Sequence, residues 1–282
     1  MDTAVPSFAS LNPGYLKKHT NMPTLKIATW NVNSLKVRLP HVLDWVAQEA
    51  PDILALQETK LTDENFPKAA IEAAGYRVCY AGQKTYNGVA ILSRIAATDI
   101  VTDLPGLADP QRRVLGASFG SLRVLNLYVP NGEAVGSDKY RYKLDWLEKL
   151  TAYLKQQLQL HKQLVVLGDF NIAPEDRDVH DPAQWQDSVL CSGPERAAFQ
   201  GLLDEGFCDT FRRFEQAEKS FSWWDYRMNA FRRNMGLRID HILASPVLCE
   251  SCVACGIDIA PRKLERPSDH TPVLAEFRVE TV

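Results

Sequence analysis

The sequence predicts an α/β fold in which two packed, mixed β-sheets are flanked by helices on their outer faces. Short runs of β-branched and leucine residues, such as Ile53 to Leu56 and Leu164 to Leu167, suit buried strands. Amphipathic segments alternate with these runs, and Gly120-Ser121 between two apolar runs indicates a hairpin. Hairpins combined with helical crossovers favour two packed sheets over one purely parallel sheet.

The expected elements follow one another along the chain. A first helix, after residue 33, carries Leu39, Val42, Leu43 and Val46 on one side and ends near Ala50. The longest helix sets leucines at helical spacing against outward lysines and glutamines. Strands are expected over 25–30, 53–56, 77–80, 88–93, 114–119, 122–129, 164–167, 237–244, 252–257 and 272–279, and further helices over 66–74, 138–161 and 195–205.

Length and composition allow one large α/β domain or two small ones, since 282 residues with 45% hydrophobic content can build a sizeable core. No linker divides the chain, so we expect one domain over 22–282, preceded by a disordered extension over 1–21 that lacks periodicity. No apolar run approaches the roughly 18 to 20 residues of a membrane span, and no secretory signal is apparent. We therefore expect a soluble, cytoplasmic monomer.

The cysteines predict no disulfide scaffold. Six of them in so long a chain fit a reducing compartment. The spacing Cys249-x-x-Cys252-x-x-Cys255 would suit zinc or a cluster, but a fourth ligand is missing nearby and the segment has the pattern of a strand. Ordinary half-buried cysteines are the better interpretation.

Charge is distributed unevenly. The net charge of -3 argues against indiscriminate binding to nucleic acid, yet Tyr226 to Arg238 holds four arginines and no acid. This segment could contact a phosphate backbone, and a solvated face is the alternative.

Five short polar signatures each end an apolar run, and polar side chains at strand ends can converge on one rim. Carboxylate and amide oxygens hold the hard divalent cations that stabilise a reacting phosphodiester. Glu58 is the leading ligand, although an isolated loop glutamate would look the same. The signatures are Thr29-Trp30-Asn31-Val32-Asn33, Gln57-Glu58-Thr59-Lys60, Gly168-Asp169-Phe170-Asn171, Arg238-Ile239-Asp240-His241 and Ser268-Asp269-His270.

The spacing within these signatures suggests roles. Asp169 and Asn171 would face the same side of an extended segment, where the acid could activate water and the amide could bind a phosphate oxygen. A β-turn is an equally good interpretation. His270, held by a carboxylate such as Asp240, would stay cationic, and otherwise it is a turn residue. Tyr128, before a Pro-Asn-Gly turn, could point into the same cleft.

Taken in order, these segments resemble the exonuclease III family of abasic-site (AP) endonucleases, within the wider DNase I-like endonuclease/exonuclease/phosphatase superfamily. The resemblance covers the chain from about Met22 to its C-terminus. It implies a four-layer sandwich with the active site at one end of the two stacked sheets. It also implies hydrolysis of DNA 5′ to abasic sites, processing of 3′ ends, or both, with magnesium, or manganese as a substitute, and double-stranded DNA as the partner.

The family's site residues carry over position by position. Asp169 would align or deprotonate water, Asp240 would pair with His270, and Trp223 and Leu237 would line a small pocket for an extruded abasic sugar. Asn33 stands where some members have aspartate. The catalytic set is Tyr128, Asp169, Asn171, Asp240 and His270; the metal set is Asn31, Glu58, Asp169, Asn171, Asp269 and His270; the DNA- or phosphate-binding set is Asn33, Asn131, Trp223, Arg227, Arg232, Arg233 and Leu237.

Two other functions compete with this one. A phosphatase or phospholipase of the same fold could act on inositol phosphates or sphingomyelin, but the aromatic and arginine-rich segment before Asp240 disfavours it. A DNA-binding protein with a decayed site would be expected to lack one of Glu58, Asp169 or His270, and all three are present.

Overall fold

Two six-stranded sheets form the centre of the computed structural model, which describes residues 24–107 and 109–278. Each sheet is mixed, because β1 pairs with β2 and β7 with β8 in parallel while the remaining pairs are antiparallel. The first sheet, in the order β11-β12-β1-β2-β4-β3, consists of Cys252–Ile257, Val273–Arg278, Thr24–Asn31, Ile53–Gln57, Val89–Ser93 and Arg77–Ala81. The second, in the order β5-β6-β7-β8-β10-β9, consists of Thr98–Val101, Val114–Phe119, Leu122–Tyr128, Gln163–Asp169, Asp240–Ala244 and Cys208–Asp209.

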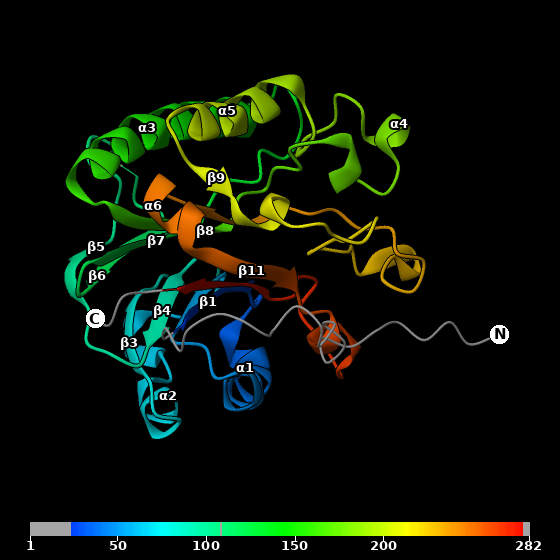
Figure 1. Cartoon of the computed structure of the whole chain (residues 1–282). Helices are drawn as coiled ribbons and strands as arrows, with labels where there is room; N and C mark the ends of the chain where they lie inside the picture. Colours follow the sequence, from blue (N-terminus) through cyan, green and yellow to red (C-terminus); the bar gives the residue numbers. More distant parts are fainter. Residues whose placement is uncertain (1–23, 108, 279–282) are drawn as a thin grey trace, which may run out of the picture.

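Helices cover the outer face of each sheet, so the chain forms the expected four layers (Figure 1). The helices α1 (Leu35–Glu49) and α2 (Lys68–Ala73) pack on the first sheet, and α3 (Asp138–Leu160) and α5 (Gly193–Asp204) pack on the second. The prediction of two packed mixed sheets flanked by helices is confirmed. Shorter helices are α4 (Pro182–Trp185), α6 (Pro246–Ser251) and single 3-10 turns at Asp63–Asn65, Asp176–Asp178, Thr210–Arg213, Arg227–Asn229 and Ala260–Lys263.

Strand β2 shows why the central strands are continuously apolar. Ile53 and Ala55 face the core between the two sheets, whereas Leu54 and Leu56 face the cluster formed with α1 and α2. Successive side chains of a strand point to opposite faces, and both faces of this sheet are covered, so both sets are apolar from Ile53 to Leu56, and the polar residue that ends the strand, Gln57, is buried with hydrogen bonds.

A buried amide network joins the two sheets. Asn126 of β7 donates from Nδ2 to the carbonyl oxygens of Leu56 and Ala90, each at 2.9 Å. Its Oδ1 accepts from Nε2 of Gln57 at 2.7 Å, and Gln57 also donates to Oγ1 of Thr29 at 2.9 Å. Both N–H groups and the oxygen of the Asn126 amide are thus hydrogen-bonded, whereas Oε1 of Gln57 has no partner among the described residues. These bonds connect β7 to β1, β2 and β4 next to Glu58.

Several element boundaries differ from the expectations. The strands β5 and β9 and the helix α6 were not predicted, because each is too short to show periodicity. Strand β10 begins at Asp240 rather than Leu237, since residue 237 instead forms isolated bridges with Val179 and Trp223. The expected extension over 1–21 and the last residue of the expected strand 272–279 lie outside the described residues.

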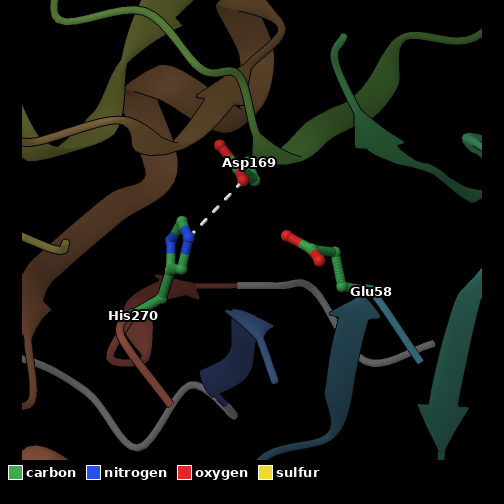
Figure 2. Close-up of side chains that lie close together, drawn as sticks. All are labelled: Glu58, Asp169 and His270. Carbon is green, nitrogen blue, oxygen red and sulfur yellow. Dashed lines mark ion pairs between the residues drawn. The ribbon is translucent and has the colours of Figure 1, made fainter. Parts of the chain in front are cut away.

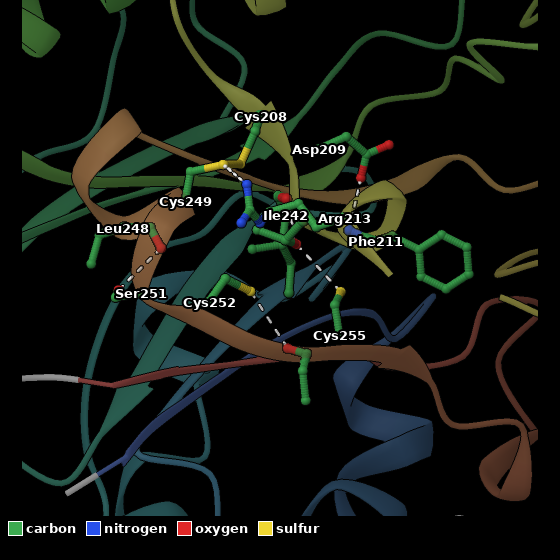
Figure 3. Close-up of a disulfide and its surroundings, with 12 residues drawn as sticks. Cys208, Asp209, Phe211, Arg213, Ile242, Leu248, Cys249, Ser251, Cys252 and Cys255 are labelled. Atoms are coloured by element: carbon green, nitrogen blue, oxygen red, sulfur yellow. Dashed lines mark hydrogen bonds between the residues drawn. A yellow bond between two sulfur atoms is a disulfide. The ribbon is translucent and has the colours of Figure 1, made fainter. Parts of the chain in front are cut away.

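The expectation that Cys249 is an ordinary half-buried cysteine on a strand is wrong. Cys208 of β9 and Cys249 form a disulfide across a Cα–Cα distance of 6.2 Å (Figure 3), and Cys249 lies in α6 rather than in a strand. The partners are 41 residues apart, so their adjacency follows from the sheet and not from spacing. Cys252 and Cys255 are free and lie on β11. Among residues 24–107 and 109–278, no helix combines the length and apolar character needed to cross a membrane.

Candidate active site

Polar side chains from both sheets meet where several strands end. Glu58 follows β2, Asp169 ends β8, and His270 lies just before β12; Figure 2 shows the three pointing toward one another. One ligand atom from each lies within 4.8 Å of the other two, as a metal site requires. Strand register adds to the cluster, because Asp169 is paired with Tyr128 of β7 on one side and with Asp240 of β10 on the other.

Asn31 links the two sheets at this rim. Its fully buried carboxamide donates from Nδ2 to Oε1 of Glu58 and to Oδ2 of Asp169, each at 2.9 Å. Its Oδ1 accepts from the backbone N–H of Asn33 at 3.0 Å, which fixes the orientation of the amide. Lys60 approaches Glu58 from the other side, with Nζ 2.9 Å from Oε2. Two carboxylates from different sheets are therefore held close together.

His270 and Asp240 form a buried pair. Nδ1 of His270 lies 2.9 Å from Oδ2 of Asp240, and Nε2 lies 3.7 Å from Oδ2 of Asp169. Burial alone would disfavour a charged imidazole, but the carboxylate of Asp240, and then that of Asp169, raise the pKa of His270 to about 10. The ring is therefore cationic at neutral pH in the protein without metal.

Asp169 is only 1% exposed, and this burial raises its pKa to about 7. The charge of His270 opposes the rise, and the charge of Asp240 adds to it. Oδ1 of Asp169 accepts the backbone N–H of Asn171 at 2.9 Å. A carboxylate with a pKa near 7 is matched to proton abstraction at neutral pH.

The segment after Asp169 is a loop, so the strand alternation that would place Asp169 and Asn171 on one face does not continue to Asn171. β8 ends at Asp169, and Asn171 has a left-handed backbone with φ 49°. Its Oδ1 accepts from Nδ2 of Asn131 at 3.1 Å, so both amides lie at the same rim. Asn33 (φ 42°) and Glu58 (φ 50°) share this left-handed conformation, which asparagine tolerates readily and which costs a glutamate about 1 kcal/mol or more.

Asp269 lies beside the cluster, with both oxygens engaged. Oδ1 accepts from Nδ2 of Asn33 at 2.9 Å, and Oδ2 accepts from Nε1 of Trp223 at 3.0 Å. Although burial opposes it, the charge of His270 and these two hydrogen bonds lower the pKa of Asp269. Tyr128 is affected in the other direction, because burial and the carboxylates of Glu58 and Asp169 raise its pKa.

The arginine-rich segment is divided by the fold. Arg227, Arg232 and Arg233 are exposed, and Arg227 pairs with Asp225 at 2.9 Å. Arg238 is 1% exposed and pairs with Asp178 at 2.6 Å and Asp209 at 2.8 Å. Its expected place in an exposed basic stripe is therefore wrong, because two buried carboxylates hold it inside.

The two expected pocket residues lie together but differ in exposure. Trp223 is partly buried and forms isolated bridges with Leu237 and His270. The side chain of Leu237 is 0% exposed and packs with Val179, Ile239 and Trp223. Trp223 is thus the member of this pair that a ligand can reach.

Two residues near the site were not identified from the sequence. Lys60 pairs with Glu58, and its place within the Gln57-Glu58-Thr59-Lys60 signature was a usable signal. Lys143 of α3 is fully buried and donates to the carbonyl oxygens of Asn131 and Asn171. The sequence could have indicated its burial, because Lys143 lies four residues before Leu147 and seven before Leu150, on the apolar face of the helix.

Comparisons with known proteins agree with this arrangement. A model of the endonuclease/exonuclease/phosphatase family matches residues 28–270. Exodeoxyribonuclease III of Haemophilus influenzae is 38% identical over 268 residues, which cover 90% of this chain and all of that protein. The structure of a Neisseria 3′ phosphatase bound to a product DNA hairpin is 49% identical with a TM-score of 0.88, covering 90% of this chain and 99% of that one. An Archaeoglobus fulgidus AP endonuclease structure is 41% identical with a TM-score of 0.87, covering 90% and 100%.

Proposed function

We propose a reaction and a substrate for this protein, which belongs to the exonuclease III and AP endonuclease family of DNA-repair nucleases. The reaction is hydrolysis of a DNA phosphodiester or 3′-phosphate ester by an activated water. The observation that carries it is the pairing of Asp169, whose pKa is raised to about 7, with His270, whose pKa is raised to about 10, beside Glu58. A proton acceptor and a fixed cation at neighbouring positions suit attack on an anionic phosphate.

The roles of the residues follow from their charges. Asp169 takes the proton of the attacking water, and cationic His270 stabilises the charge that develops on the phosphate oxygens, with Asp240 keeping the ring oriented and charged. The carboxamides of Asn131 and Asn171 bind the phosphate without adding negative charge. The phenol of Tyr128 stays protonated because its pKa is raised, so it donates a hydrogen bond to the same group.

The donor set fits a hard divalent cation, and we propose magnesium, with manganese as a substitute. Four carboxylates, Glu58, Asp169, Asp240 and Asp269, meet at this rim against the cations His270 and Lys60. Glu58, Asn31 and Asp269 would hold the ion, and Asp169 and Asn171 would be available as further oxygen ligands. When bound, it supplies Lewis-acid stabilisation of the phosphate and the leaving oxygen.

The substrate we propose is double-stranded DNA that carries an abasic site or a blocked 3′ end. Exposed Arg232 and Arg233 would contact the backbone, and Trp223 would line the pocket for a sugar without a base. The Neisseria relative is described as a 3′ phosphatase and the Archaeoglobus relative as an AP endonuclease, and both activities use the chemistry proposed above. We further propose that the protein acts as a monomer.

The test uses three labelled duplexes, with an internal abasic-site analogue, a plain 3′ end and a 3′-phosphate end, each assayed with magnesium and with chelator. Magnesium-dependent incision 5′ to the abasic analogue would establish AP endonuclease activity, and release of phosphate alone would establish a 3′ phosphatase. Asp169→Asn should lose orders of magnitude in either reaction. Asp176→Asn, at an exposed position, is the matched control. Inactivity of the wild-type protein on all three duplexes would refute the proposal.

A further inference from the structure

A fully buried ammonium group lies behind the proposed phosphate-binding amides. Lys143 of α3 donates from Nζ to the carbonyl oxygen of Asn131 at 3.1 Å and to that of Asn171 at 2.6 Å. The third partner is Oε1 of Glu195 in α5, at 2.5 Å. An ammonium has three donors, and these three acceptors use all of them.

The counter-ion of Lys143 is itself fixed by hydrogen bonds. Oε1 of Glu195 also accepts the backbone N–H of Leu190 at 3.0 Å, and Oε2 accepts the N–H and hydroxyl of Ser192 at 3.1 and 2.6 Å. Both charged side chains are 0% exposed. Glu195, at the start of α5, therefore holds the ammonium in place between its two carbonyl partners.

Packing does not explain a charge at this position. The neighbours of Lys143 along the helix face include Leu147 and Leu150, and an apolar residue would continue that stripe. Replacing a buried ion pair by apolar residues is often neutral or stabilising, so the pair needs another reason. What an apolar side chain could not do is bind two backbone carbonyl groups.

Both of those carbonyl groups belong to loops that leave the second sheet. Asn131 follows the end of β7, and Asn171 follows the end of β8 with a left-handed backbone, so neither has a strand partner to fix it. Their side chains bond to each other, and Nδ2 of Asn171 also donates to the carbonyl oxygen of Val129 at 3.0 Å. One nitrogen atom thus holds the backbone carbonyl groups of both residues whose carboxamides bond to each other.

We propose that Lys143, anchored by Glu195, is a positioning residue that sets the placement of the Asn131 and Asn171 carboxamides for the bound phosphate. It touches no substrate and acts only through these two residues. The inference rests on the proposed function for the identity of the phosphate. Misplacement of binding groups by about 1 Å can cost roughly 100-fold in rate, so its loss should lower kcat by about 10- to 100-fold and change KM little.

The test variant is Lys143→Met combined with Glu195→Gln, which keeps side-chain length and leaves no charge unpaired. The matched control is Lys155→Met, because Lys155 also lies on α3 and pairs with Glu205 at the end of α5 at 3.0 Å, but on the surface. Lys143→Arg, which keeps a charge and several donors, should restore part of the kcat. The readouts are kcat and KM on the substrate found above, and the side-chain amide NMR signals of Asn131 and Asn171.

We expect the double variant to lose kcat and to shift both amide signals, while the control changes neither. Unchanged amide signals, or a kcat within about twofold of wild type, would overturn the proposal. If the double variant fails to fold, Ser192→Ala decides the question, with Tyr140→Phe as its control. Ser192→Ala removes the hydroxyl that donates to Glu195 and should shift the same signals by less. It also removes the bond between the hydroxyls of Ser192 and Tyr140, and Tyr140→Phe removes that bond alone and should leave the signals unchanged. Since the NMR readout needs no substrate, it tests the positioning role even if the wild-type protein proves inactive on DNA.

Discussion

Replacement of Asp240 by asparagine should separate the charge of His270 from its orientation. The carboxylate lies 2.9 Å from Nδ1 of the imidazole, and asparagine is close to it in shape but uncharged. Oδ1 of the asparagine can still accept a hydrogen bond from the ring. The change therefore removes most of the electrostatic support for the cation and keeps its contact.

The size of the effect follows from the pKa of His270. The rise from 6.5 to about 10 corresponds to roughly 5 kcal/mol in favour of the charged ring. One opposite charge in contact shifts a pKa by about 1 to 3, so loss of Asp240 should bring His270 down by about 2, toward 8. The ring is charged below its pKa. The variant therefore keeps its cation at pH 7 and loses about nine-tenths of it at pH 9, where the wild type remains charged.

Two measurements test this reasoning. The imidazole signals of His270 should titrate at lower pH in Asp240→Asn than in wild type, with both proteins in chelator and with His270→Ala identifying the signals. The ratio of wild-type to variant kcat should then grow about tenfold between pH 7 and pH 9 with metal present. A constant ratio, or the same titration pH in both proteins, would refute the view that Asp240 holds the charge.

Other expectations concern stability and DNA binding. Burial, and then the charge of Arg238, lower the pKa of His241 from 6.5 to about 4. Between these two pH values only the unfolded chain binds the extra proton. The free energy of unfolding therefore falls as pH falls, by about 3 kcal/mol at most. Urea unfolding across that window should show a weaker pH dependence in His241→Gln, and an equal dependence would contradict it. The Cys208–Cys249 disulfide closes a loop of about 40 residues, so Cys208→Ser should lower the free energy of unfolding by up to about 4 kcal/mol under oxidising conditions. Cys191→Ser, at a free cysteine, is the control, and an unchanged stability of Cys208→Ser would show that the bond is absent in solution. The double variant Arg232→Ala with Arg233→Ala should reduce the slope of log Kd against log salt concentration by about 2. Arg227→Ala should change the slope less, because Asp225 already neutralises Arg227. Equal slopes for all the proteins would exclude this surface as a DNA contact.

The fold and the members of the rim could be predicted from the sequence because both depend on local patterns. Runs such as Leu164 to Leu167 reveal a strand by composition, and the polar residue at its end is brought to the rim by chain direction alone. The order of the signatures then supplied the family. Glu58, Asp169 and His270 are consequently within reach of one another.

The remaining features depend on contacts between distant segments. Arg238 could not be separated from its exposed neighbours, because the two carboxylates that bury it lie far away in sequence at Asp178 and Asp209. The loop at Asn171 is held in part by hydrogen bonds to Asn131 and Lys143, which lie 40 and 28 residues away and which no local pattern reveals. A disulfide between β9 and α6 requires knowledge of the strand order.

The amide of Asn126 has a consequence for how this enzyme tolerates change. The surface between the sheets is otherwise largely apolar, and apolar contacts are non-directional, so they resist separation of the sheets far more than sliding. The directional bonds from Asn126 to Leu56 and Ala90, together with the bond from Asn31 to Asp169, add resistance to sliding. Glu58 follows β2 in one sheet, and Asp169 ends β8 in the other. A substitution that weakens these bonds would therefore let the two carboxylates shift relative to each other, and would reduce catalysis before it prevents folding.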